Sequence, residues 1–369
     1  MSYKILDYKL KNISELGYDV SIISSNDCEV DDSIFRNNNI KTFFINMNRK
    51  INIKDDLISI IKLKNLLKEE DFDLVHTHTA KAGIIGRVAA KLAGVPVIIH
   101  TSHGLPYFDG MSKSKYLIYK NIERIGAIFS NRLGSQNKED LKKLQELTKN
   151  KKKVFYEGNG VDLDYLDYES SNISEESICN LKRELNIDKD KIIILMAARF
   201  ESVKNHKLFI DAINEVVKVN KNIICILAGD GPLENEIKGY IREYNLDNIF
   251  RLVGKRNDIY KFIKFSDIVA LTSIKEGIPR IIMESMAFEK PVVATNVLGT
   301  RELVINKETG LLSELNDVND LVNNMKVLIN DKSLRNIYGK NARIRIESDF
   351  TEKMVAKRLD VIYSECLKI

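Results

Sequence analysis

Residues 273–284 read SIKEGIPRIIME, and the interpretation of the whole chain starts from them. A continuous apolar run, residues 267–271, leads into this stretch and is typical of a parallel strand buried on both faces. The segment from Glu276 to Pro279 then predicts a turn. Pro279 suits the start of the following helix, because its missing N–H costs nothing at the first helical position. The stretch therefore predicts a strand, a turn and a helix in direct succession.

The same stretch has the chemistry of a polar binding site. The N–H groups at a helix start have no partner inside the helix and carry partial positive charge, which suits an anionic ligand such as phosphate. Glu276 on the turn and Glu284 in the helix bring two carboxylates to this region, which is unfavourable unless they bind hydroxyls such as those of a sugar or ribose. The alternative is an ordinary strand–turn–helix with two solvated glutamates, and the spacing alone does not decide between them.

Composition limits the classes of protein that the chain can represent. Its 369 residues are enough for two domains, and 44% apolar and 30% charged residues are typical of a soluble globular protein. A net charge of +5 is too small to indicate nucleic-acid binding. We find no signal peptide and no apolar run long enough for a bilayer, so we expect a cytoplasmic protein. Apart from the pairs His76/His78 and His100/His103, no Cys or His falls at zinc-ligand spacing, so we expect no metal.

Strand-like and helix-like segments alternate through both halves of the chain. In the first half, strands are expected at residues 18–23, 41–46, 73–78, 95–100 and 152–156. In the second half, strands are expected at residues 191–197, 222–228, 249–253, 267–271 and 291–294. This alternation predicts the α/β class, with two doubly wound parallel sheets and the ligand in the cleft between them at the strand carboxyl ends. We place the domains at residues 1–165 and 166–348.

The N-terminus departs from this pattern. Residues 9–16 are typical of a helix end, with Gly17 as its cap before the strand at residues 18–23. Only Met1 to Leu6 is left for an earlier strand, and no Gly-rich loop follows it. Either Tyr3 to Leu6 is a stub that leads directly into the helix, or the first strand and its loop are absent from this chain. We favour absence.

In the second half, charged and small residues follow the predicted strands. Arg199 and Lys204 lie on one loop after the strand at residues 191–197, where they could clamp a diphosphate. A solvated basic loop is the alternative. Residues 229–232, beginning with Gly229, form a tight turn that either lets the backbone approach another group closely or simply connects two elements.

In the first half, histidines occupy the equivalent positions. His103 follows a strand beside Gly104 and is a candidate hydrogen-bond donor or acid–base group, or else a histidine whose partners are backbone groups. His76, His78 and Lys81 at another strand end are weaker candidates, for which we favour a structural role.

Taken together, these residues resemble the retaining glycosyltransferases of the GT-B fold, in the family 4 group. Seven motifs follow the family's order, at residues 101–104, 158–162, 198–205, 229–232, 276–284, 291–295, and 302 with 310–312. The most specific is the pair of glutamates Glu276 and Glu284. The first half is most similar to the branch that builds capsules and lipid-linked oligosaccharides, on residues 76–83 and 103–111.

The resemblance implies a hexose or N-acetylhexosamine donated by a UDP-sugar. It implies an acceptor saccharide on undecaprenyl diphosphate, in the synthesis of capsule, O-antigen or another surface polysaccharide. It also implies a C-terminal helix, residues 349–369, that packs back on the first domain. The family's first strand ends in a Gly-rich loop that contacts donor phosphate and acceptor, and we do not find that loop here.

Roles for individual residues follow from the resemblance. Arg199 and Lys204 would hold the diphosphate, Glu284 would bond the ribose hydroxyls, and Glu276 and His103 would contact the transferred sugar. The donor-binding set also includes Gly229, Gly277, Ile278 and Pro279. His78 and Lys81 would lie on the acceptor side. Because the leaving diphosphate helps to take the acceptor proton, no protein nucleophile, metal or cofactor is required, and catalysis is positioning and electrostatic stabilisation.

The segment 111–153 is strongly basic, with twelve Lys or Arg against four Asp or Glu. Its helix carries Lys113, Lys115, Lys120 and Arg124 together with apolar residues. We hypothesise that it lies on an anionic membrane, which would place the protein on the inner face of the plasma membrane. A solvated helix face followed by a lysine-rich loop is the alternative.

Two other functions compete with transfer. One is a different GT-B activity, such as a nucleotide-sugar epimerase. The other is a non-catalytic protein that binds a sugar nucleotide or partners another transferase, because the Gly-rich loop is lost. The combination of Arg199 and Lys204 with Glu276 and Glu284 favours transfer.

Overall fold

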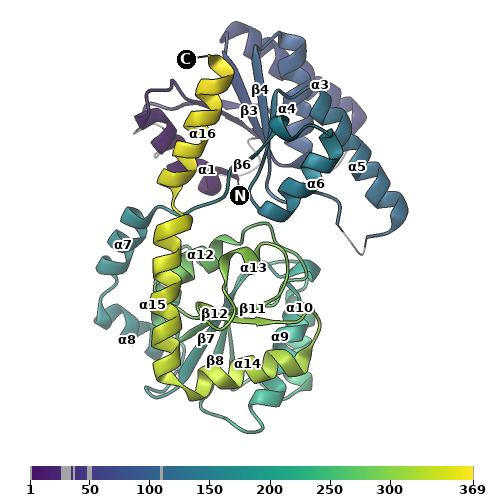
Figure 1. Ribbon diagram of the computed structural model, residues 1–369. Coiled ribbons are helices and arrows are strands. Elements are labelled where there is room, and N and C mark those ends of the chain that lie inside the picture. Colours follow the sequence, from purple (N-terminus) through teal and green to yellow (C-terminus); the bar gives the residue numbers. More distant parts are fainter. Residues whose placement is uncertain (1, 26–34, 36–37, 48–51, 109–110, 369) are drawn as a thin grey trace. The chain divides into compact units, whose positions relative to one another are not determined.

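The computed structural model divides into two compact units, each built from parallel strands that alternate with helices (Figure 1). Unit 1 comprises Met1–Asn159 and Glu352–Ile369, and unit 2 comprises Gly160–Thr351. The structure describes residues 2–25, 35, 38–47, 52–108 and 111–368. Asp109 and Gly110, part of the motif at residues 103–111, lie outside the described residues. The predicted α/β class with two Rossmann-like sheets is confirmed.

Unit 1 holds two parallel sheets. The larger has the strand order β3-β4-β5-β6, and in the smaller β1 pairs with β2. The strand bounds are β1 Ser21–Ser24, β2 Lys41–Phe44, β3 Leu74–His78, β4 Val97–Ser102, β5 Arg132–Ser135 and β6 Val154–Tyr156. The helix bounds are α1 Ser2–Glu15, α3 Ile53–Glu69, α4 Ala80–Ala93, α5 Lys113–Ile128, α6 Lys138–Thr148 and α16 Glu352–Leu367, with a short 3₁₀ turn at Lys151–Lys153.

Strand β4 shows how the helices of unit 1 cover both faces of the larger sheet. Val97 and Ile99 pack in a core with residues of α1 and α16, whereas Ile98 between them packs against α3 and α4. Successive side chains of a strand point to opposite faces, so these two cores lie on opposite sides of the sheet. All six residues of β4 are buried, which explains why its apolar half, residues 97–99, shows no alternation.

Tyr3 to Leu6 lies within helix α1, so of the two alternatives given above the strand stub is not formed. One strand of unit 1 differs from the sequence predictions. Strand β5 is not among the predicted strands, because its four residues include only one large apolar side chain, Leu133. Its Gly134 is required by packing, since a Cβ there would come within 2.4 Å of Thr101 Oγ1. Close packing against β4, rather than strand propensity, therefore specifies β5.

Unit 2 contains one six-stranded parallel sheet with the order β12-β11-β10-β7-β8-β9. The strand bounds are β7 Ile192–Ala197, β8 Ile223–Ala228, β9 Phe250–Gly254, β10 Ile268–Leu271, β11 Val292–Thr295 and β12 Gly310–Ser313. The helix bounds are α7 Leu163–Asn172, α8 Glu175–Glu184, α9 His206–Val216, α10 Glu234–Glu243, α11 Ile259–Phe265, α12 Arg280–Ala287, α13 Thr300–Leu303, α14 Val318–Asn330 and α15 Lys332–Asp349, with a 3₁₀ turn at Ser202–Lys204.

The strand order of unit 2 reverses between β7 and β10. From β7 the chain runs outward through β8 and β9, then returns to the other side of β7 and continues through β10, β11 and β12. In open parallel sheets the loops at the carboxyl ends of the two strands at such a switch point form a crevice, and this is where ligands bind. We therefore expect a ligand site of this unit at the loops that follow β7 and β10.

His206 is buried at the start of α9 in unit 2 and shapes the pH dependence of stability. Its side chain packs edge-on against Phe200, and neither ring nitrogen has a hydrogen-bond partner among the described residues. Burial, together with the nearby Lys204, lowers the pKa of His206 from 6.5 to about 4. Below pH 6.5 the unfolded chain therefore binds a proton that the folded chain does not, and stability falls as the pH falls toward 4.

Replacing His206 by Leu should make the protein less sensitive to acid. Between pH 8 and pH 5 the His206 contribution corresponds to a loss of about 2 kcal/mol, which the variant should not suffer. Urea denaturation of parent and His206→Leu at both pH values measures the difference. If both proteins lose the same free energy of unfolding between these pH values, His206 does not titrate as described.

Candidate functional site

The loops after β7 and β10 contact each other at the switch point of unit 2. Lys204 Nζ donates to Glu276 Oε1 at 2.6 Å, and the Ile274 N–H donates to the Val203 carbonyl at 2.8 Å. Two of the residues predicted from sequence, seventy-two positions apart, are thus brought into direct contact. Lys204 and Ser273 both bond Glu276 Oε1, whereas Arg199 and Glu284 pair with Glu201 and Arg280. We call Arg199, Lys204, Ser273, Glu276 and Glu284 the switch-point cluster.

Glu276 is held by more than Lys204. Its Oε1 also accepts a hydrogen bond from Ser273 Oγ at 2.5 Å, and its side chain is only 10% exposed. Ser273 is missing from the sequence-predicted site residues, although its position three residues before Glu276 on the same turn was a usable signal. The Lys204 side chain is 23% exposed and so remains partly accessible beside this fixed carboxylate.

Arg199 lies on the same loop as Lys204 but pairs with Glu201. The Nη1–Oε1 distance is 3.0 Å, and the two side chains are 43% and 36% exposed. Exposed ion pairs of this kind contribute about 0–1 kcal/mol. The guanidinium can therefore exchange Glu201 for another anion at little cost, and its planar donors suit a phosphate.

The turn that begins at Gly229 supports the loop that carries Arg199. A Cβ at Gly229 would lie 2.0 Å from the Ala198 carbonyl oxygen, and one at Gly231 would lie 2.6 Å from the Phe200 carbonyl oxygen. The Phe200 N–H in turn donates to the Asp230 carbonyl at 2.7 Å. The backbone of this turn thus closely approaches the loop that carries Arg199, as the sequence analysis allowed. Donor contact by Gly229 stays a prediction.

Helix α12 holds the second glutamate of the cluster. Glu284 Oε1 accepts from Arg280 Nε at 2.8 Å and from the Tyr260 hydroxyl at 3.2 Å, and the residue is 7% exposed. Burial and the nearby Glu284 carboxylate raise the pKa of Tyr260, which keeps its hydroxyl protonated and able to donate.

The start of α12 is fixed by close backbone packing. Pro279 is the N-cap, and because proline has no N–H, backbone donors at this helix end come from its neighbours, not from Pro279 itself. A Cβ at Gly299 would lie 1.8 Å from the Gly277 carbonyl oxygen, so the loop before α13 packs directly against the turn. Gly277, Ile278 and Pro279 are thereby held at the positive end of the helix.

In unit 1, four histidines gather at the carboxyl ends of β3 and β4. His78 Nδ1 lies 2.9 Å from His103 Nε2, and the His76 ring is tilted against that of His78 with their centroids 4.3 Å apart. His76 also bonds the Thr101 hydroxyl at 2.8 Å and the Tyr363 hydroxyl at 2.6 Å. His100 bonds Thr77 on the neighbouring strand. We call His76, His78, His100 and His103 the histidine cluster.

Burial keeps the histidine cluster uncharged. It lowers the pKa of His76 to about 4 and that of His103 to about 3, with the pKa values of His78 and His100 also well below 6.5. In the neutral His78–His103 pair one ring donates and the other accepts, so the tautomers are coupled. His103 is therefore suited to hydrogen bonding as a neutral imidazole, with Nδ1 as its remaining polar atom.

A buried ion pair lies beside the histidine cluster and was not predicted from sequence. Lys9 Nζ of α1 donates to Glu157 Oε1 at 2.5 Å, and the side chains are 2% and 0% exposed. Burial alone would raise the pKa of Glu157, but the Lys9 ammonium outweighs it and holds that pKa below its usual range. No sequence pattern links two residues 148 positions apart, so only the fold could reveal this pair.

Lys81 forms an ion pair with Asp56 of α3, outside the histidine cluster. Its Nζ pairs with Asp56 at 2.6 Å and ties α4 to α3, which favours a structural role. Within the described residues, no group of three or more His, Cys, Asp and Glu side chains is arranged to hold a metal ion. Across the same part of the chain, no helix is both long and apolar enough to cross a bilayer.

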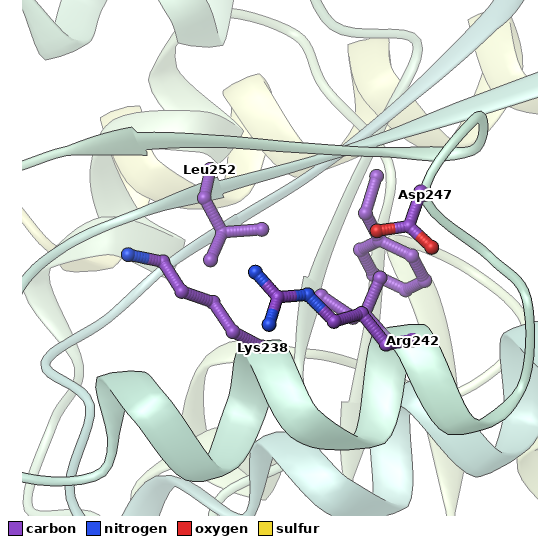
Figure 2. Close-up of a pocket in the computed structure, with 6 residues that line it drawn as sticks. Lys238, Arg242, Asp247 and Leu252 are labelled. Atoms are coloured by element: carbon purple, nitrogen blue, oxygen red, sulfur yellow. The ribbon is translucent and has the colours of Figure 1, made fainter.

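A pocket of about 170 Å³ lies elsewhere in unit 2, between α10 and β9 (Figure 2). It is lined by Lys238, Ile241, Arg242, Asp247, Phe250 and Leu252. Figure 2 shows Lys238 and Arg242 rising from one helix, with Leu252 and Asp247 facing them. It shares no residue with the switch-point cluster, and Lys238 is already paired with Glu234 at 2.6 Å, so we assign it no role.

Two protein-family models match the chain. The model described as glycosyl transferases group 1 matches residues 178–345, and the model described as glycosyl transferase 4-like matches residues 6–137. An Escherichia coli protein named UDP-Gal:alpha-D-GlcNAc-diphosphoundecaprenol alpha-1,3-galactosyltransferase is 34% identical over 351 residues, which cover 94% of this chain and 88% of that protein. The Staphylococcus aureus capsular polysaccharide biosynthesis glycosyltransferase CapM is 26% identical and covers 100% of this chain and 95% of its own length.

Solved structures share the fold. A glycosyltransferase from Rickettsia africae has a TM-score of 0.79 at 23% identity, covering 98% of this chain and 95% of its own. The Anabaena protein HepE in complex with UDP and glucose has a TM-score of 0.81 at 20% identity, covering 97% of this chain and 95% of its own. At these identities the likeness concerns the fold.

Gly229→Ala should destabilise the protein, because its Cβ would overlap the Ala198 carbonyl oxygen and displace the Arg199 loop. Overpacking of this kind costs about 1–3 kcal/mol. The matched control is Gly239→Ala on α10, where a Cβ would meet nothing within 4 Å. There the change should stabilise by up to about 1 kcal/mol. Thermal unfolding measures both, and similar shifts for the two variants would contradict the packing described.

Glu157→Gln should be strongly destabilising, because it leaves the buried Lys9 ammonium without its carboxylate. Such a loss costs about 3–5 kcal/mol, whereas Lys9→Met combined with Glu157→Leu should recover much of it. Glu15→Gln is the control, since its pair with Lys11 on the same helix is exposed and contributes at most about 0.5 kcal/mol. Urea denaturation measures the free energy of unfolding of both variants. An equal loss for Glu157→Gln and Glu15→Gln would contradict a stabilising role for the buried pair.

Proposed function

The chain belongs to the GT-B glycosyltransferases of group 1, and we propose that it is a retaining enzyme that moves a hexose or N-acetylhexosamine from a UDP-sugar to a saccharide on undecaprenyl diphosphate. Its family membership makes it a transferase and sets aside both the non-catalytic protein and the epimerase. The proposal concerns the donor, the acceptor and the stereochemistry.

The observation that carries the proposal is the contact between Lys204 and Glu276 at the switch point of unit 2. It gathers a cation and a carboxylate at one edge of the sheet, with Arg199 on the same loop and the positive end of α12 after the same turn. A nucleotide sugar needs both kinds of group, cations for its diphosphate and carboxylates for its hydroxyls. HepE, which shares the fold, is described in complexes with UDP and with UDP-glucose, which supports a UDP-sugar as donor.

The cluster suggests how the donor would be engaged. Arg199 would leave Glu201 for the diphosphate, and Lys204, beside Glu276, would contribute a second charge as the diphosphate departs. Groups already in place when that charge develops stabilise the transition state without reorganisation. Glu276, fixed by Ser273, would then accept from a hydroxyl of the sugar, and Glu284 from the ribose.

The names of relatives support the acceptor. The Escherichia coli relative acts on a GlcNAc-diphosphoundecaprenol, and a Campylobacter jejuni relative, 29% identical over 236 residues, is named for a diphospho-undecaprenol saccharide. We therefore propose a role in capsule, O-antigen or other surface polysaccharide synthesis. His103 would bond the donor sugar as a neutral imidazole, with His78 and Lys81 on the acceptor side. No metal or cofactor takes part in this proposal.

A lipid-linked acceptor places the substrate at a membrane. We therefore propose that the protein acts at the inner face of the plasma membrane as a peripheral protein, with the basic segment 111–153 near the anionic surface. Attraction between clustered Lys or Arg and anionic lipids contributes about 1 kcal/mol per residue close to the surface.

Arg199→Ala and Glu276→Gln should each lower turnover by about 100-fold, since each removes a preorganised group from the charged reacting centre. Lys207→Ala is the matched control, because Lys207 is a nearby cation whose exposed i,i+4 pair with Asp211 should not affect transfer. The measurement is UDP release from a panel of UDP-sugars with a saccharide-diphospholipid acceptor. Unchanged turnover in Arg199→Ala, or an equal loss in Lys207→Ala, would contradict the assignment.

A further inference from the structure

Tyr260 of α11 lies against one side of α12 in unit 2, next to the carboxylate of Glu284. Arg280, Glu284 and Phe288 follow one another at intervals of four residues along α12 and its C-cap, so they share this side of the helix. The Tyr260 hydroxyl donates to Glu284 Oε1 at 3.2 Å. Its ring stacks on that of Phe288, with the centroids 5.9 Å apart and the planes 13° from parallel. One side chain of α11 thus contacts two of the three residues in this row.

The Tyr260 ring is held from a second side as well. Tyr165 of α7 meets it edge-on, with the centroids 6.0 Å apart and the planes at 75°. Stacked and edge-on arrangements at these separations are the favoured ones for aromatic pairs, so the ring has little freedom to turn. A phenylalanine would fill the same space between Tyr165 and Phe288. The aromatic packing therefore fixes where the hydroxyl lies, but it does not by itself explain why a hydroxyl is present.

Both hydrogen bonds to the Glu284 carboxylate end on the same oxygen. Oε1 accepts from the Tyr260 hydroxyl and, at 2.8 Å, from Arg280 Nε. An ionised carboxylate offers about two lone pairs on each oxygen, so both lone pairs of Oε1 are used. No group of the described residues donates to Oε2, and with 10% of the side chain exposed this oxygen is not sealed in the core. Two donors on one oxygen thus fix the plane of the carboxylate and leave the other oxygen for a ligand.

Arg280 also offsets the charge of Glu284. The two side chains form an ion pair across one turn of α12 and are 25% and 10% exposed. An unpaired carboxylate would repel a diphosphate bound nearby, whereas a paired one can accept from hydroxyls without adding net charge to the site. Glu276 is paired in the same way with Lys204. Each glutamate of the switch-point cluster therefore has its own cation, which makes it compatible with an anionic ligand.

We propose that Tyr260 is a positioning residue that, together with Arg280, turns Glu284 Oε2 toward the ribose hydroxyls of the bound nucleotide and makes the site select a ribonucleotide over its deoxy form. The two lone pairs of Oε2 match the two neighbouring hydroxyls of a ribose. Hydrogen bonds to a charged acceptor are stronger than neutral ones, and an acceptor already held in place loses little of that strength to rearrangement. The inference rests on the proposed function, in which Glu284 bonds the ribose, and adds the residues that orient it.

The test compares the binding of UDP with that of dideoxy-UDP, the analogue that lacks both ribose hydroxyls, by calorimetric titration of the full chain. The parent protein should bind UDP at least about tenfold more tightly. Tyr260→Phe, which keeps the ring in its aromatic packing, should weaken UDP alone, so that the preference for UDP falls by at least about threefold. The matched control is Tyr240→Phe on α10, whose hydroxyl bonds the exposed Glu236 at 3.1 Å and which should keep the preference of the parent.

A further pair of variants shows whether Tyr260 acts through Glu284. Glu284→Gln should remove most of the preference for UDP over dideoxy-UDP. Adding Tyr260→Phe to Glu284→Gln should not lower the preference further, because the two changes disturb the same interaction and their effects are then not additive. A tyrosine that only stabilises the fold would instead lower both affinities by the same factor in either background.

Three outcomes would overturn the inference while the proposed function stands. They are an unchanged preference in Tyr260→Phe, an equal weakening of both ligands, and an effect of Tyr260→Phe on the preference that persists in full beside Glu284→Gln. A parent that binds UDP and dideoxy-UDP equally would contradict the ribose contact of Glu284, and this inference with it. A parent that binds neither ligand would contradict the UDP-sugar donor itself, so the two kinds of failure are distinguishable.

Discussion

The 2.6 Å contact between Lys204 and Glu276 depends on the topology of unit 2 more than on either side chain. It forms because the strand order reverses between β7 and β10, which puts the two loops side by side at the carboxyl edge of the sheet. Two glycines then allow the loops to pack closely against their neighbours, Gly229 against Ala198 and Gly299 against Gly277. Two charged side chains on separate loops are thereby held in one fixed arrangement.

The polar groups at the carboxyl ends of the strands in unit 1 differ from those of unit 2 in burial and charge. There the polar groups are buried and neutral or internally paired, as in the His78–His103 pair and the Lys9–Glu157 pair. Burial holds the histidines uncharged, so they can orient a hydroxyl but carry no charge to a phosphate. The polar groups at the strand ends thus differ between the units, with accessible cations in unit 2 and neutral histidines beside a buried ion pair in unit 1.

The sequence predicted the elements whose signal is local. The apolar run before Glu276, the turn and the opening of α12 at Pro279 follow from periodicity and turn chemistry, and the structure has all three. The sequence did not predict β5, in which a side chain at Gly134 would clash with Thr101, and it did not predict the Lys9–Glu157 pair. Those depend on which segments meet in space, and only the folded chain contains that information.

The central claim is that the switch-point cluster binds the diphosphate of a nucleotide sugar. The most direct measurement is a calorimetric titration of the full chain with UDP and, separately, with uridine. The account predicts that UDP binds far more tightly than uridine, and that combining Arg199→Ala with Lys204→Ala removes this difference while leaving uridine binding unchanged. Equal affinities of the parent for UDP and uridine, or a difference that persists in the double variant, would contradict it.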